Sequence, residues 1–217
     1  MSQSSSSRVL KPAGTETDFT RSVDREIIRQ IGELNRRGLQ VLRRALQEGQ
    51  ASLPPMVSEL RDAWLGLDAA AEARAAEAPY LLFDLRLEPL DGAVVEPSPE
   101  LETADWFHHA RGRAYVRLLS HFSWQVCRGR PIAATLLLGL SPETALRLGD
   151  LDLAAVDTIA DRPGEHLVLR WGDDRWFWSR RLTAAARGDA RVLWQTTLAG
   201  VQRLAALSRS TLTTTAS

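Results

Sequence analysis

The sequence of 217 residues contains an internal repeat with one constant offset, and this repeat limits the folds that the chain can adopt. The anchors of the repeat lie 84 residues apart, as in Leu67-Asp68 and Leu151-Asp152, Pro79 and Pro163, and Leu85-Arg86 and Leu169-Arg170. Matching alanines add little in an alanine-rich chain, but these pairs favour a duplication over chance similarity between two capped helices. A unit this small buries its apolar face poorly alone. We therefore expect two copies to pack about a pseudo-two-fold axis, as a dimer fused into one chain.

The first repeat is predicted at residues 19–87. Apolar residues three or four apart, from Ile27 to Ala45, predict a long first helix. Asp68 can cap a later helix, because its carboxylate can accept hydrogen bonds from first-turn amides, and Pro79 ends that helix. The expected helices lie at about 20–47, 56–67 and 69–78, and the alternating residues 80–87 are expected to be extended.

The second repeat is predicted at residues 104–207 and follows a similar plan. Ser141-Pro142 is a strong helix start, Asp152 repeats the cap of the first copy, and Pro163 ends the capped helix. The expected helices lie at about 104–127, 132–138, 142–149, 153–160 and 189–207, with an extended segment at 166–171. The predicted fold class is therefore all-α, with two helical repeats packed as an intrachain pseudo-dimer and a short extended segment after the third helix of each repeat.

The segments outside the repeats are predicted to lack regular structure. The polar tails at 1–18 and 208–217 have no apolar periodicity, and the proline-rich residues 88–103 are typical of a linker. No apolar run approaches the roughly 18–20 residues of a membrane span, so we expect no membrane contact. The single cysteine, Cys127, cannot form an intrachain disulfide, which is typical of a cytoplasmic protein.

The charge balance limits how the chain could bind nucleic acid. Lysine and arginine together number 27, as do aspartate and glutamate, so the formal net charge is zero. This balance argues against binding of nucleic acid by bulk charge. Lys11 is the only lysine, and every other basic side chain is arginine. This bias suits recognition of phosphate or carboxylate groups, and it also follows from GC-rich codon usage.

Sequence motifs of common catalytic and metal sites are absent. The chain has no phosphate-binding glycine-rich loop ending in Lys-Ser/Thr, no G-x-S-x-G, no H-E-x-x-H and no Cys-x-x-Cys. His108 and His109 are adjacent, so on a helix they point about 100° apart and cannot easily chelate one ion. We therefore expect no catalysis, metal, cofactor or small-molecule substrate.

An aromatic run near the end of the second repeat is a candidate partner-binding site. Three consecutive large rings cannot all face one core on either a helix or a strand, and aromatic residues with arginine are typical of interface anchors. The alternative is that Trp176 and Trp178 are buried against the other repeat, and the sequence favours neither interpretation. The candidate partner-binding residues are Trp171, Arg175, Trp176, Phe177 and Trp178.

Residues 132–145 have the outline of a helix-turn-helix motif: a helix, a glycine-containing turn and a serine-capped second helix. The second helix carries one residue suited to base contacts, Arg147, and the glycine spacing departs from the usual motif. A plain helical hairpin is favoured over insertion into a DNA groove. Arg128 and Arg130 flank this region, so the candidate nucleic-acid-binding residues are Arg128, Arg130 and Arg147.

Several of these segments resemble FlhD, a subunit of the bacterial flagellar transcriptional regulator. The resemblance lies in residues 138–145, 151–160, 166–171 and 192–204. In the first repeat, Ile31-Gly-Glu-Leu-Asn35 resembles the opening helix of that family, and residues 60–87 resemble its middle. It implies an all-helical fold, dimerisation, and activation of transcription together with an FlhC-like partner. Two copies in one chain would then imitate the FlhD dimer.

The resemblance also implies which functions belong to the partner subunit of such a regulator. The FlhC-like partner would supply any metal site and much of the affinity for promoter DNA. The family's cysteine in the extended segment corresponds to Phe83 or Leu167 here, so no disulfide-linked dimer is expected. A second hypothesis is a helical adaptor or chaperone of a secretion or motility apparatus that binds proteins without DNA. The neutral charge and the aromatic run motivate this alternative.

Overall fold

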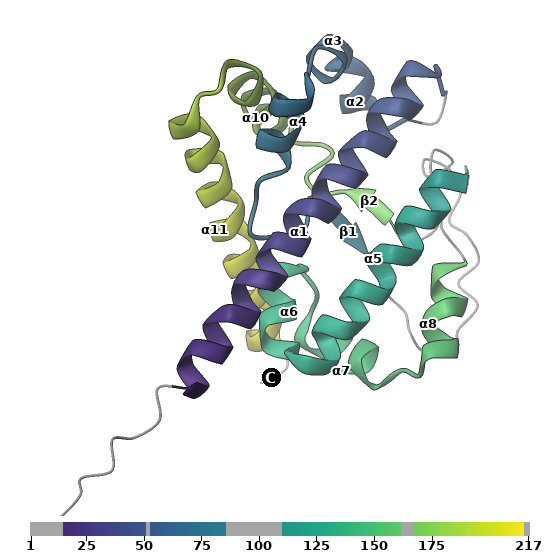
Figure 1. Ribbon diagram of the computed structural model, residues 1–217, viewed down its shortest axis with the longest axis vertical. Helices are drawn as coiled ribbons and strands as arrows, with labels where there is room; N and C mark the ends of the chain where they lie inside the picture. The colour runs from purple at the N-terminus through teal and green to yellow at the C-terminus, as the bar shows by residue number, and fades with distance from the viewer. Residues whose placement is uncertain (1–14, 51–52, 86–109, 162–166, 215–217) are drawn as a thin grey trace, which may run out of the picture.

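The fold is mostly helical with one short two-stranded ribbon, in agreement with the predicted all-α class (Figure 1). The computed structural model describes residues 15–50, 53–85, 110–161 and 167–214. The elements in those ranges are α1 (Thr15–Gln47), α2 (Pro55–Glu59), α3 (Arg61–Leu65), α4 (Ala69–Ala76), β1 (Phe83–Leu85), α5 (Ala110–Gly129), α6 (Pro131–Leu137), α7 (Pro142–Asp150), α8 (Leu153–Ala160), β2 (Leu167–Leu169), α10 (Arg175–Arg187) and α11 (Ala190–Thr214). Within them, no helix combines the length and the apolarity needed to cross a bilayer.

The two capped helices at the anchors of the repeat have matching bounds and matching caps. α8 begins and ends 84 residues after α4. Asp68 accepts a hydrogen bond from the Ala71 amide at 2.6 Å, and Asp152 accepts one from the Ala155 amide at 2.8 Å. Each aspartate satisfies a first-turn N–H that has no partner inside its helix. Both caps were expected from the sequence, and both are confirmed.

β1 and β2 also lie 84 residues apart, and they pair with each other. The pairing is antiparallel, with Asp84 opposite Val168 and the flanking residues paired in register. Asp84 faces its own equivalent, Val168, and the pairs on either side of it, Phe83–Leu169 and Leu85–Leu167, are exchanged by a two-fold axis through this central pair. This is the local geometry of a two-fold contact.

The helices lie around this ribbon in two similar groups (Figure 1). α1 and α5 lie side by side across the middle of the view. α4 packs on α1, and α8 packs on α5 on the other side of the pair. The short helices α2 and α3 lie at the upper end of the view, and α6 and α7 at the lower end. α10 and α11 form a hairpin in which α10 packs on α4 and α11 contacts α6.

Some elements differ from the expectations. The predicted helix at 56–67 is two short helices, which break at Leu60 (φ −98°, ψ 22°). No helix is expected at α10, because Arg181 interrupts the apolar residues of its buried face, Phe177, Trp178, Leu182 and Ala185. α1 begins at Thr15 and α11 ends at Thr214, beyond the predicted limits of 19 and 207. Extending an existing helix costs little once its first turn has formed.

Some predictions fall outside the described residues. They are the linker at 88–103, the tail at 1–14 and 215–217, residues 86–87 and 166 of the extended segments, and the first residues of the second repeat, 104–109.

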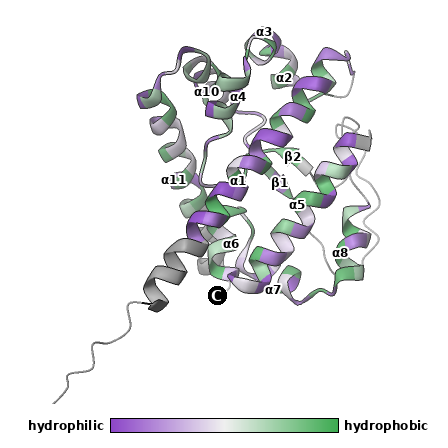
Figure 2. Cartoon of the chain, in the orientation of Figure 1, coloured by the Kyte–Doolittle hydropathy of each residue, from purple (hydrophilic) through white to green (hydrophobic). Residues whose placement is uncertain are grey.

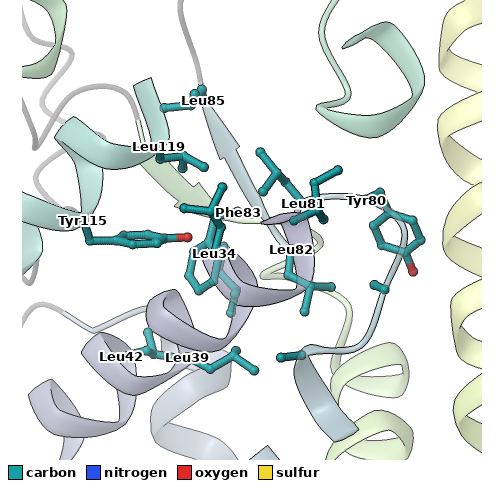
Figure 3. Close-up of a cluster of buried hydrophobic side chains, with 14 of the residues drawn as sticks. Leu34, Leu39, Leu42, Tyr80, Leu81, Leu82, Phe83, Leu85, Tyr115 and Leu119 are labelled. Carbon is teal, nitrogen blue, oxygen red and sulfur yellow. The ribbon is translucent and has the colours of Figure 1, made fainter. Parts of the chain in front are cut away.

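The connection between α4 and β1, residues 77–82, is largely buried beside α1 (Figure 3). A buried segment without regular structure must find partners for its backbone polar groups. Asn35 of α1, which is fully buried, supplies partners for two of them and for the last carbonyl of α4. Its Nδ2 donates to the carbonyls of Ala76 (3.2 Å) and Tyr80 (2.9 Å), and its Oδ1 accepts from the Leu82 amide (2.8 Å).

The second half of the chain supplies further partners for this connection. The buried guanidinium of Arg181 in α10 donates to the carbonyls of Ala75 (2.7 Å) and Glu77 (2.8 Å). The Leu81 amide donates to the Leu137 carbonyl, and the Arg170 amide donates to the Leu82 carbonyl, each at 2.9 Å. The last turn of α4 and the connection after it are therefore held from three sides, by α1, α10 and the α6–β2 region.

We predict that Asn35→Ala lowers the free energy of unfolding by roughly 3 kcal/mol or more, because it leaves three buried backbone groups without partners. Urea unfolding followed by circular dichroism measures the change. Gln30→Ala on the same helix is the control, since Gln30 donates only to the exposed Glu26, and it should change the stability by less than about 0.5 kcal/mol. Equal effects of the two substitutions would contradict the role given to Asn35.

Candidate functional site

The start of α10 carries the predicted aromatic run and is fixed by an aspartate cap. The Asp174 carboxylate accepts hydrogen bonds from the Phe177 amide (2.9 Å) and from Arg203 of α11 (2.6 Å). Partial burial alone would raise the pKa of Asp174, but the hydrogen bonds from Phe177 and Arg203 outweigh it and lower the pKa. The cap therefore stays ionised and ties the start of α10 to α11.

Two of the predicted partner-binding residues, Phe177 and Trp178, are fully buried. The Trp178 indole packs on Trp64 of α3 with 5.3 Å between ring centroids, and its Nε1 donates to the Arg170 carbonyl at 3.0 Å. Phe177 and Trp178 are therefore core residues, and the prediction that they bind a partner is wrong. Of the two interpretations of the run, burial against the first half of the chain describes Trp178.

Trp176 has a different environment from its neighbours, because successive helical residues point about 100° apart. Its side chain is 56% exposed, and the Arg180 guanidinium lies 4.9 Å from the ring centroid. Arg175 is also exposed and makes only a loose ion pair with Glu59 at 3.8 Å. Trp176 and Arg175 are thus accessible to a partner.

Trp171 is part of the core packing that precedes α10. Its ring is half-buried and lies edge-on to Tyr80 (5.6 Å) and Phe177 (4.6 Å), with the Arg203 guanidinium 5.5 Å from its centroid. Its backbone has φ 52°, a conformation that is uncommon for residues other than glycine. Trp171 therefore joins the turn before α10 to the connection after α4 and to α11.

α11 carries an exposed apolar surface that sequence reasoning missed. Trp194, Leu198 and Val201 are 64%, 38% and 39% exposed, and their spacing of four and three places them on one helix face. We call these three residues the α11 stripe. The periodicity of the sequence could have found this stripe, because its three residues recur at helical spacing within the predicted helix at 189–207.

A groove of about 850 Å³ borders the α11 stripe. Trp194 forms one wall and Ile28 of α1, which is 43% exposed, forms another, with Ala78 and Pro79 between them. α11 can lie close to the core here because Gly200 has no side chain, and a Cβ atom there would come within 2.0 Å of the Tyr80 hydroxyl. The stripe and groove together form a candidate protein-binding surface, because exposed apolar surface of this kind marks interaction sites.

Each of the three predicted nucleic-acid-binding arginines contacts another side chain of the protein. The Arg128 guanidinium lies 5.3 Å from the Trp124 ring centroid. Arg130 forms an ion pair with Asp24 of α1, and Arg147 pairs with Glu143 at 2.7 Å. These contacts are exposed or half-exposed, and exposed ion pairs contribute little to stability.

The α6–α7 hairpin has the predicted form, with Gly139 in the turn at φ 70° and Ser141 accepting a hydrogen bond from the Thr144 amide. Its turn is held from inside by Arg170, whose Nη2 donates to the Leu138 carbonyl at 2.5 Å. Its exposed surface mixes apolar residues, such as Ile132 (83%) and Leu146 (57%), with the charged residues Glu143, Arg147 and Asp150 of α7. Arg147, the one residue of the second helix suited to base contacts, already pairs with Glu143, which favours a plain helical hairpin over insertion into a DNA groove.

No cluster of three or more histidine, cysteine, aspartate or glutamate side chains suited to a metal ion occurs among the described residues. Cys127 is a buried free thiol, and burial raises its pKa to about 12.

No family model, no curated protein and no solved structure matches this chain.

We predict that Trp178→Ala lowers the free energy of unfolding by about 3–5 kcal/mol, since it removes a fully buried ring and leaves a cavity. Trp176→Ala is the matched variant two residues away, and it should cost less than about 1 kcal/mol because that ring is largely exposed. Chemical unfolding followed by circular dichroism measures both. A larger effect of Trp176→Ala than of Trp178→Ala would contradict the arrangement of the aromatic run.

We also predict that Cys127 in the folded protein reacts with iodoacetamide at pH 8 at least about a hundredfold more slowly than in urea, because only the thiolate reacts and this thiol is buried. Mass spectrometry of the alkylated protein follows the reaction. Equal rates in buffer and in urea would show that Cys127 is accessible.

Proposed function

We propose that the chain is a fused pseudo-dimer of an FlhD-like unit and acts in the cytoplasm as a transcriptional regulator subunit. In this proposal it binds an FlhC-like protein, and the complex reaches promoter DNA. The observation that carries the proposal is the strand pairing centred on Asp84 and Val168, in which each strand meets its equivalent 84 residues away. A symmetric homodimer forms such a contact between two chains.

The arrangement of the helices around the strands supports the same interpretation. α4 and α8 have equal lengths and equal aspartate caps, and they pack on α1 and α5 respectively. The α10–α11 hairpin has no counterpart among the described residues of the first half. A fused dimer with this hairpin at one end would offer a partner one binding surface instead of two equivalent ones.

The surfaces of the described residues support contact with protein more strongly than direct contact with DNA. The α11 stripe is apolar, and Ile132 and Leu146 add exposed apolar area on the α6–α7 hairpin. The three candidate DNA-binding arginines already contact Trp124, Asp24 and Glu143. We therefore place the FlhC-like partner on the α11 stripe and assign to that partner most of the DNA affinity.

A second candidate function is a protein-binding adaptor or chaperone of a secretion or motility apparatus. The apolar α11 stripe and the zero net charge suit this function as well as they suit the regulator, because neither feature requires DNA. The two functions share the surface and differ in whether the complex binds promoter DNA.

We predict that co-expression with an FlhC-like protein yields a stable complex, and that Trp194→Ala weakens it by roughly 30-fold, the cost of losing one exposed aromatic anchor. Leu153→Ala is the control, because Leu153 is an exposed apolar residue of α8 outside the stripe and the groove beside it. Affinity is measured by biolayer interferometry with the immobilised partner.

The same complex is then titrated with a promoter fragment over a series of salt concentrations. The proposal predicts salt-sensitive DNA binding by the complex and much weaker binding by the chain alone. Formation of the complex without DNA binding would favour the adaptor. Absence of any complex would contradict the regulator proposal.

A further inference from the structure

A groove lined by arginines lies between the second half of α1 and the first half of α5 and has a volume of about 540 Å³. Hydrophilic residues alternate with apolar ones along both helices in Figure 2. We call this the arginine groove. Its basic side chains come from both helices: Arg37, Arg43, Arg44 and Arg111.

The acidic residue in the groove is already neutralised inside the protein. Glu72, which is buried, accepts hydrogen bonds from Gln40 Nε2 at 2.6 Å and from Arg43 Nη1 at 3.3 Å. These contacts do not saturate Arg43, because its Nε has no hydrogen-bond partner in the structure. The lining of the groove therefore contains four guanidinium groups and one carboxylate.

The other arginines of the groove can turn toward a ligand at little cost. Arg37 and Arg44 pair with Glu33 (3.4 Å) and Glu48 (2.6 Å) of their own helix, in exposed contacts. Such pairs on a helix surface contribute only a few tenths of a kcal/mol. Arg111 is exposed, and no carboxylate within the described ranges pairs with it.

The other end of the same helix pair shows that packing α1 against α5 does not require these arginines. There, a groove of about 390 Å³ lies between the first half of α1 and the second half of α5. It contains one arginine, Arg130, which pairs with Asp24, and it also contains Glu26. The two grooves lie at opposite ends of one helix contact, yet only one of them gathers guanidinium groups.

The lining points to a ligand that is anionic at one end and apolar at the other. Guanidinium groups bind phosphate through two parallel hydrogen bonds. Val41, Ala114 and Leu118 add an apolar wall to the same groove. The volume falls within the roughly 300–1,000 Å³ that is usual for small-molecule sites.

We propose that the arginine groove binds a phosphorylated small molecule of nucleotide size. Its phosphate groups lie against Arg43, Arg44 and Arg111, and its apolar part lies along Ala114 and Leu118. This site is separate from the α11 stripe, and the proposal does not depend on the proposed regulatory function. The arginine bias of the sequence, left open above, has a use here, because arginine matches phosphate geometry better than lysine does.

Calorimetric titration of the full chain at low salt tests the proposal with two probes, inorganic pyrophosphate and ATP. We expect both to bind, ATP more tightly because it also covers the apolar wall. Arg44→Gln and Arg111→Gln should each weaken binding by about tenfold, the usual cost of one lost charge-assisted hydrogen bond. Arg25→Gln is the control, since Arg25 is an exposed arginine of α1 outside the groove lining.

Exposed arginines can be replaced without disturbing the core. Circular dichroism checks that each variant is folded. Equal affinities for pyrophosphate and ATP would show that the groove binds only the phosphate groups and would contradict the part given to the apolar wall. Absence of binding by both probes, or equal affinities of Arg111→Gln and Arg25→Gln for ATP, would overturn the proposal. Binding of a short DNA duplex through the same arginines, without ATP binding, would also overturn it and make the groove a nucleic-acid surface.

Discussion

The fold depends on hydrogen bonds to the buried connection between α4 and β1. This connection must cross the core to bring β1 against β2, so its backbone cannot be hydrated and has to bond to protein. Asn35 of α1 bonds two of its polar groups and the last carbonyl of α4, and Arg181 of α10 bonds the nearby carbonyls of Ala75 and Glu77. These two side chains are more than a hundred residues apart, and they join the two ends of the chain around one segment.

Arg181 and Arg74 form a reciprocal pair of helix caps. Arg181 of α10 donates to carbonyls at the end of α4, while Arg74 of α4 donates to the Ala185 carbonyl near the end of α10 at 2.8 Å. Each guanidinium lies where the carbonyls of a helix end concentrate negative charge. A fully buried arginine is tolerated here because these dipoles and Thr197 occupy its donors, even though burial lowers its pKa.

The sequence predicts the features that depend on near neighbours and misses those that depend on distant ones. Asp68, Asp152 and Ser141 are recognisable as caps, because each accepts from an amide three residues later. The strands are predicted as extended segments, but their mutual pairing follows only from the symmetry suggested by the repeat. α10 is missed because its buried face includes Arg181, whose hydrogen-bond partners lie about a hundred residues earlier in α4 and cannot be recognised from the local sequence. The arginine groove is missed because Arg44 and Arg111 are far apart in the chain and meet only when α1 packs on α5.

Hydrogen exchange followed by NMR tests most directly the claim that this buried connection holds the two halves together. The amides of Leu81, Leu82 and Arg170 make the bonds that join the connection to α6, α1 and β2. If the connection holds the halves together, these amides exchange only through global unfolding, with the same free energy as the most protected amides of α1 and α5. Exchange of the three amides at much lower free energy, while α1 and α5 stay protected, would show instead that the halves are stable without this connection.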